Sequence, residues 1–156
     1  MKYLELKCPP PIVMFFSGML AWFIAQRDIE FLQQQIKEVD AVLWPLLFII
    51  IGILLAVTGV KEFKQHKTTI SPLDPTKSSS LVASGVYQFT RNPMYLGMLL
   101  VLLGWADLLD TILAFSGAVA FFIYISFFQI IPEEDIMKKK FGQNFIQYCE
   151  KVRRWL

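Results

Sequence analysis

The chain has 156 residues and a formal net charge of +2, and 55% of its residues are hydrophobic and 15% aromatic. A soluble domain of this length needs much more polar surface, so the composition excludes an ordinary soluble protein and predicts one membrane domain over residues 1–156. The charge is small and no basic block is interleaved with stacking aromatics, so nucleic acid is not an expected partner.

Four apolar runs predict an all-α, polytopic integral membrane protein with about four transmembrane helices. The first run resembles the core of a signal peptide, but Gln26-Arg27-Asp28 follows it in place of a small-residue cleavage site. We therefore expect a helix there, and we expect the second run to continue past Val60 as a polar helix. The predicted spans are residues 9–25, 42–60, 93–106 and 111–131.

The third run is short and carries two glycines. At about 1.5 Å per residue it covers roughly 21 Å, which is less than the ~30 Å thickness of a hydrocarbon core. Gly97 and Gly104 lie two turns apart on one face, which predicts close contact with another helix.

The connecting segments differ in character. The polar connector from Arg27 to Asp40 is expected to lie on the membrane surface, in part as a short helix. The segment from Thr68 to Ser80 contains two prolines and three consecutive serines, so it predicts a long loop, and long loops tend to be functional. After Pro132 the chain becomes amphipathic, which predicts one or two surface helices broken near Gly142.

Positive charge orients this bundle, because lysine and arginine gather on the cytosolic side. Thirteen of the 15 basic residues fall on the side of the two termini and the long loop, and only Arg27 and Lys37 fall on the other. Both termini are therefore expected in the cytosol, most simply at a bacterial inner membrane. The sequence does not determine the oligomeric state.

The cysteines and the single histidine carry little functional signal. Cys8 and Cys149 are expected to be free thiols, since two cysteines cannot form a disulfide framework and both fall on the cytosolic side. Cys8 also lacks the small residues that precede a lipoprotein cysteine. His66 has no acid or cysteine at ligand spacing, so no metal site is expected.

The segment Arg91-Asn92-Pro93-Met94-Tyr95 concentrates polar and aromatic residues at a membrane border. One interpretation is a helix N-terminus with Asn92 as cap and Pro93 in the first position. The other is a cofactor pocket beside that helix, to which Asn92 and Tyr95 supply hydrogen bonds.

The acidic pair Glu133-Glu134 allows two interpretations as well. Acids just outside a membrane are commonly solvated. These two, however, follow Pro132, which kinks or ends a helix and can turn their side chains inward. The second interpretation places them at the same pocket as Arg91.

Taken together, these motifs resemble the C-terminal core of the integral-membrane methyltransferases that include isoprenylcysteine carboxyl methyltransferase and the phospholipid methyltransferases. The resemblance covers about Thr69 to Arg154. It implies S-adenosylmethionine as methyl donor, bound on the cytosolic side, and a lipophilic or small apolar acceptor that enters from the bilayer. The matching motifs are Leu81-Val82-x-x-Gly85-Val86-Tyr87, Arg91-Asn92-Pro93-x-Tyr95, Glu133-Glu134 and Phe141-Gly142-x-x-Phe145-x-x-Tyr148.

Carried over by position, the resemblance implies a cofactor site, and the chemistry of the implied donor suggests roles for three charged residues. Arg91 would hold the carboxylate of the donor, Glu133 would balance its positive charge, and Glu134 is the nearest candidate base for an amine or thiol acceptor. The implied cofactor contacts are Ser79, Leu81, Val82, Tyr87, Asn92, Pro93, Met94, Tyr95 and Glu133.

Three positions depart from the family pattern. The family often has histidine at the positions of Asn92 and Ser79. The isoprenylcysteine enzymes place a substrate-binding arginine at the position of Gln129, and a neutral amide cannot pair with a carboxylate as a guanidinium does. The resemblance therefore implies the fold and the cofactor but not a prenylcysteine substrate, and we expect Gln129 to line the acceptor side.

Two other functions remain open at this point. Sterol reductases share a similar C-terminal region and use NADPH without a glycine-rich dinucleotide turn, so a membrane reductase is one alternative. A non-catalytic bundle that binds a lipid is the other.

Overall fold

The computed structural model describes residues 5–27, 39–69 and 73–156, and within these ranges it contains helices and no strand, as the all-α prediction requires. The surface helix predicted between Arg27 and Asp40 falls almost entirely outside the described residues. The longer helices are α1 (Pro10–Ala25), α3 (Val39–Gln65), α4 (Pro93–Leu108), α5 (Phe115–Ile125), α6 (Ile131–Phe141) and α7 (Gln143–Lys151). Short helical turns are η2 (Pro75–Lys77), η3 (Gly85–Gln88), η4 (Ile112–Ala114) and the π-helical η5 (Ser126–Ile130).

Within the part of the chain that the structure describes, two helical stretches are long and apolar enough to cross a membrane: Ala41–Gln65, and Ile112–Phe141, which joins η4, α5, η5 and α6. Helices α1 and α4 are apolar but have 16 residues each, so each covers only about 24 Å. Large apolar side chains of α3 face outward, and Trp44 and Leu54 are 67% and 59% exposed. Such a surface is expected against lipid.

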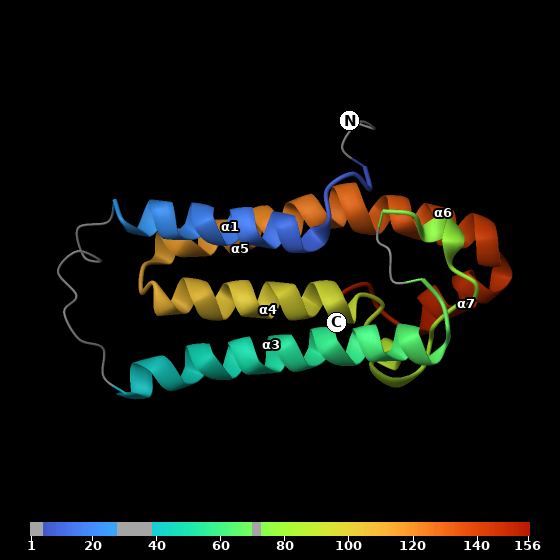
Figure 1. The fold of residues 1–156 in the computed structure, drawn as a ribbon, viewed down its shortest axis with the longest axis horizontal. Coiled ribbons are helices and arrows are strands. Elements are labelled where there is room, and N and C mark those ends of the chain that lie inside the picture. Colours follow the sequence, from blue (N-terminus) through green and yellow to red (C-terminus); the bar gives the residue numbers. More distant parts are fainter. Residues whose placement is uncertain (1–4, 28–38, 70–72) are drawn as a thin grey trace.

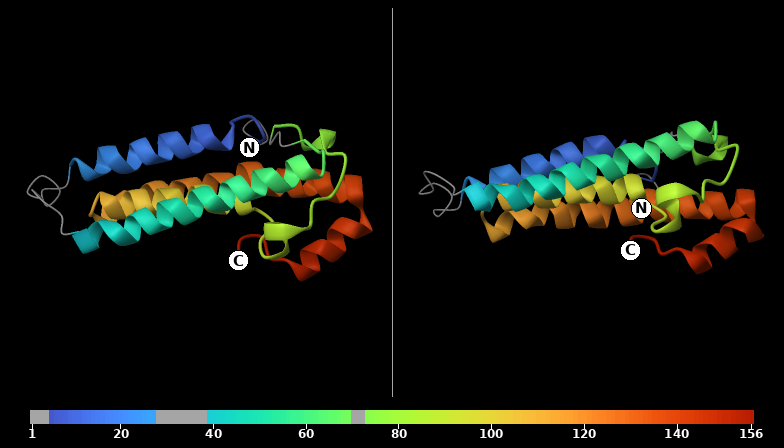
Figure 2. Two further views of the ribbon diagram at one scale, coloured as in Figure 1. Left: turned by 60° about the horizontal axis from the view of Figure 1, so that its bottom comes forward. Right: turned by 90° about the horizontal axis from the view of Figure 1, so that it is seen from below.

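Helix α4 lies at the centre of the bundle, with α3 on one side and α1 and α5 on the other (Figures 1 and 2). Glycines allow α3 and α4 to approach closely. A Cβ atom added to Gly104 would lie 2.5 Å from the carbonyl oxygen of Pro45, and one added to Gly97 would overlap the carbonyl oxygen of Gly52. The close contact predicted for Gly97 and Gly104 is thus confirmed, and α3 is its partner.

The last long helix does not end at Pro132. It runs on through α6, and the π-helical turn η5 immediately precedes the proline. Because proline has no N–H to donate to the preceding turn, a locally wider helix accommodates it. The helix ends instead at Gly142, whose φ of +52° strongly favours glycine, so the predicted break there is confirmed.

The described part of the loop after α3 and the segments after Pro132 fold together at one end of the bundle, where α4 begins (Figure 2). Tyr148 of α7 donates its hydroxyl hydrogen to the carbonyl oxygen of Tyr87 over 2.7 Å, and Lys140 of α6 donates to the carbonyl oxygen of Thr76. This end of the molecule carries the candidate site.

Candidate active site

A pocket opens at this end of the bundle between four separate parts of the chain. Its walls come from the end of α3, the loop before α4, the junction of η5 with α6, and α7. The lining residues are Phe63, Leu81, Val82, Tyr87, Arg91, Asn92, Ile130, Glu133, Glu134, Met137, Phe145 and Tyr148. Seven of the residues predicted for the site, from three separate sequence motifs, therefore meet in one cavity.

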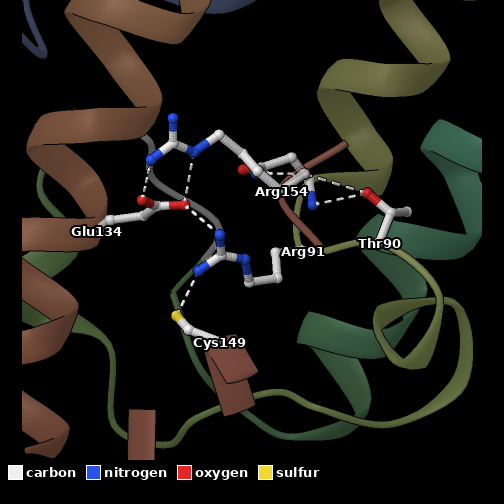
Figure 3. A network of polar contacts seen from close by, with 6 residues as sticks. Thr90, Arg91, Glu134, Cys149 and Arg154 are labelled. Carbon is white, nitrogen blue, oxygen red and sulfur yellow. Dashed lines mark hydrogen bonds and ion pairs between the residues drawn. The ribbon is translucent and has the colours of Figure 1, made fainter. Parts of the chain in front are cut away.

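Arg91 and Glu134 belong to a charged network at the rim of this pocket (Figure 3). Nη2 of Arg91 lies 3.3 Å from Oε1 of Glu134, and the other Nη atom donates to Sγ of Cys149. Arg154 approaches the same carboxylate with two donors, Nη2 to Oε2 at 2.7 Å and Nε to Oε1 at 3.1 Å. Two guanidinium groups therefore share one carboxylate, and both of its oxygens are engaged within the protein.

Glu133 also lines the pocket, and its carboxylate contacts α4. The hydroxyl of Tyr95 donates to its Oε2 atom over 3.0 Å. Tyr95 is 5% exposed, and Gln129, which is 1% exposed in the π-helical turn, interacts with both side chains. Tyr95 and Gln129 therefore lie behind Glu133 and do not line the pocket.

Asn92 occupies the N-cap position of α4 and Pro93 its first turn, as one interpretation of the sequence expects, but the side chain of Asn92 makes no capping hydrogen bond. Its Nδ2 atom instead donates to the carbonyl oxygen of Arg154 over 2.9 Å. A tertiary contact has replaced the local cap, while Asn92 still lines the pocket.

Two tyrosines form the part of the wall where the loop before α4 meets α7. The ring of Tyr87 packs on Phe63 with 5.4 Å between centroids, and its carbonyl oxygen accepts the hydrogen bond from Tyr148. Burial raises the pKa of both phenols above their ordinary value, and the Glu133 carboxylate adds to the rise at Tyr87. Both hydroxyls therefore stay protonated and act as donors.

Two donors in the pocket wall lack a protein acceptor. Among the described residues, none accepts a hydrogen bond from the buried hydroxyl of Tyr87 or from Nε of Arg91. Buried donors are normally paired, and an unpaired one costs about 1–3 kcal/mol. The pocket is thus suited to a ligand that carries hydrogen-bond acceptors.

The amino-acid sequence of the chain matches a known protein family. Residues 41–144, about two thirds of the chain, match the family model described as phospholipid methyltransferase. The chain belongs to this family. The match covers most of the pocket lining and favours a methyltransferase over the reductase and the non-catalytic bundle.

Two known proteins are similar in sequence to this member of the phospholipid methyltransferase family. The chain is 31% identical over 109 residues to protein-S-isoprenylcysteine O-methyltransferase B of Arabidopsis thaliana, which is 69% of this chain and 54% of the plant protein. It thus spans about half the length of that relative. It is also 46% identical over 63 residues, 40% of its length, to the whole of an uncharacterized protein of Haemophilus influenzae. No solved structure matches the chain.

Besides Tyr95, three residues predicted to touch the cofactor lie outside the pocket lining: Ser79, Pro93 and Met94. Ser79 is exposed and does not line the pocket. Its backbone N–H donates to Oγ1 of Thr68 over 2.8 Å, and this hydrogen bond connects the loop to the end of α3. Pro93 and Met94 pack against Gly59 of α3 at the helix interface. His66 is exposed, and the described residues contain no cluster of His, Cys, Asp and Glu that could hold a metal.

Several site residues were not assigned roles from the sequence. Phe145 and Tyr148 were recognised as a motif, and their three-residue spacing, which puts both on one face of α7, could have identified them as pocket walls. Arg154 offered no such signal, because a basic residue in a tail is equally explained by membrane topology.

Proposed function

We propose that the protein is an S-adenosylmethionine-dependent methyltransferase that acts at the cytosolic membrane face on a lipophilic or small apolar acceptor. The observation that carries the proposal is the convergence of two unpaired donors, from Tyr87 and Arg91, with the half-buried carboxylate of Glu133 in one pocket. The family membership supports it.

The chemistry of these residues fits the proposed donor. S-adenosylmethionine, when bound, supplies a methyl group activated by a positively charged sulfur. Arg91 is suited to bind its carboxylate, and Tyr87 can donate to a carboxylate or ribose oxygen. Glu133 offers a negative charge to its cationic part, and the aromatic rings of Phe63 and Phe145 can pack against its adenine or stabilise positive charge.

The remaining walls contribute by positioning and by excluding water. Methyl transfer from a sulfonium is an in-line displacement without a covalent enzyme intermediate, so alignment and a dry site provide most of the rate enhancement. Apolar side chains of Leu81, Val82, Ile130 and Met137 suit this task.

We assign Glu134 to hold Arg91 in place rather than to act as a base. Its carboxylate is shared between two guanidinium groups, so both of its oxygens are already engaged in ion pairs within the protein. A carboxylate acceptor needs no base, and this assignment is compatible with such an acceptor.

We further propose that α1 and α4 span the membrane together with the two longer helices, with both termini in the cytosol. Thirteen of 15 basic residues then lie on the cytosolic side, as the positive-inside rule requires. The pocket lies at that end, where α4 begins, so an amphiphilic acceptor can reach it from the bilayer.

Calorimetry on the detergent-purified protein tests the proposed function. S-adenosylmethionine and its demethylated product should both bind, and NADPH should not. Binding of NADPH alone would establish a reductase, and no heat with any of the three would leave a lipid-binding bundle.

A further inference from the structure

The tail that follows α7 lies alongside the start of α4. The carbonyl oxygen of Arg153 accepts a hydrogen bond from the backbone N–H of Arg91 over 3.0 Å, and the carbonyl oxygen of Arg154 accepts one from Asn92 over 2.9 Å. Trp155 packs against the hydrophobic core. The main chain of the tail is thereby fixed beside two residues that line the pocket.

The side chain of Arg154 adds a second connection. Its Nε and Nη2 atoms hold both oxygens of Glu134, at 3.1 Å and 2.7 Å, while Arg91 contacts Oε1 of the same carboxylate at 3.3 Å (Figure 3). The two hydrogen bonds from Arg154 restrict the carboxylate of Glu134 to one orientation. That orientation determines where the guanidinium of Arg91 lies.

The two arginines differ in their exposure. The side chain of Arg154 is 39% exposed and is not part of the pocket wall, whereas that of Arg91 is 13% exposed and lines the pocket. Arg154 therefore has no direct access to a ligand in the pocket. Any effect it has on binding must pass through Glu134 or through the backbone.

We infer that Arg154 is a positioning residue that orients Arg91 toward the pocket through Glu134. The inference rests on the proposed function only for the identity of the ligand that Arg91 meets. Without the Arg154 side chain, Glu134 can rotate and Arg91 must follow it, and Arg91 then also changes its contact with Cys149.

Donor affinity provides the first test. Arg154→Ala should weaken S-adenosylmethionine binding about five- to ten-fold, at the lower end of typical coupling between sites because the side chain is partly exposed. Arg154→Lys retains the positive charge but cannot form the paired hydrogen bonds to Glu134, so it should recover only part of the lost donor affinity. Arg153→Ala is the matched control, since its exposed side chain lies outside the network and the backbone contacts persist.

A double-mutant cycle separates positioning from general loosening. If Arg154 acts through Glu134, then Arg154→Ala should have less than a two-fold effect on donor affinity in a Glu134→Gln background. Full additivity of the two changes would overturn the inference.

The second test does not depend on the donor. In a Cys8→Ser background, the alkylation rate of Cys149 reports the position of Arg91, and Arg154→Ala should change it at least three-fold while Arg153→Ala leaves it unchanged. A wild-type protein that binds no S-adenosylmethionine would refute the proposed function, and this rate would still decide the role of Arg154. An unchanged rate in Arg154→Ala would refute that role.

Discussion

The hydroxyl of Tyr95, in the first turn of α4, donates to Oε2 of Glu133 on α6 over 3.0 Å. The contact joins two motifs that are 38 residues apart in the sequence and fixes the carboxylate at the inner wall of the pocket. One oxygen of Glu133 thereby accepts a hydrogen bond on the side of α4, and this bond orients the carboxylate toward any cation that the pocket accepts.

Glu133→Gln should weaken binding of S-adenosylmethionine by about 1.5–3 kcal/mol, the scale of a hydrogen bond to a charged group. The substitution preserves the shape of the side chain and removes its negative charge. Calorimetry measures the change, and Asp135→Asn is a matched control because Asp135 is exposed and does not line the pocket. Wild-type affinity in Glu133→Gln would show that this carboxylate does not hold the donor.

Tyr95→Phe removes the hydroxyl and leaves Glu133 without its partner on α4. We expect donor affinity to fall by about 1 kcal/mol, less than in Glu133→Gln, because the carboxyl group remains and loses one of its hydrogen bonds. The effect should largely vanish when both substitutions are combined, since both act on one interaction. Equal losses in the two backgrounds would instead point to a direct contact of Tyr95 with the ligand.

The sequence was most informative where local rules and membrane physics act alone. The apolar runs predicted the positions of the helices, since hydrophobicity and length depend on neighbouring residues only. The spacing of Gly97 and Gly104 predicted a close contact, and the motifs around Arg91 and Glu133 were expected to meet in one site. These features are present in the structure.

The details that the sequence did not reveal depend mainly on contacts between residues distant in the chain. The local rule made Asn92 a helix cap, but its amide binds the carbonyl oxygen of Arg154, 62 residues away. Pro132 was expected to kink or end a helix, whereas the π-helical turn before it lets the helix continue. The two arginine partners of Glu134 lie far from it in sequence, so residue spacing did not reveal them.

Gln129→Arg distinguishes two views of this buried position. The sequence alone placed Gln129 on the acceptor side, where an arginine would change the choice of acceptor and leave donor affinity within a few-fold. In the structure Gln129 interacts with Glu133 and Tyr95, so we expect the new guanidinium to neutralise Glu133 and to weaken donor binding about ten-fold, or about 1.4 kcal/mol. Gln129→Met is the uncharged control. Unchanged donor affinity in Gln129→Arg with altered acceptor preference would support the first view.

Gly97→Ala should destabilise the contact between α3 and α4. The new methyl group would overlap the carbonyl oxygen of Gly52, and backbone atoms cannot yield as flexible side chains do. We expect a loss of about 1–3 kcal/mol, visible as a lower midpoint of thermal unfolding in detergent. Gly18→Ala is the control, because a Cβ atom there meets its nearest neighbour, a side-chain atom of Leu102, at 3.6 Å. Equal stability of the two variants would contradict the tight packing of this interface.

Cysteine labelling in sealed, right-side-out vesicles tests the topology and, with it, the side on which the pocket opens. In a chain with Cys8→Ser and Cys149→Ser, a cysteine at the exposed position Ser79 should react with a membrane-impermeant reagent only after the vesicles are opened. A cysteine at Arg27, which follows the opposite end of α1 and is also exposed, should react from outside without opening. Thirteen basic residues on the side of Ser79 favour this result, because moving lysine and arginine across a membrane is costly. Labelling of the Ser79→Cys variant from outside would reverse the orientation and remove the cytosolic donor site from the proposal.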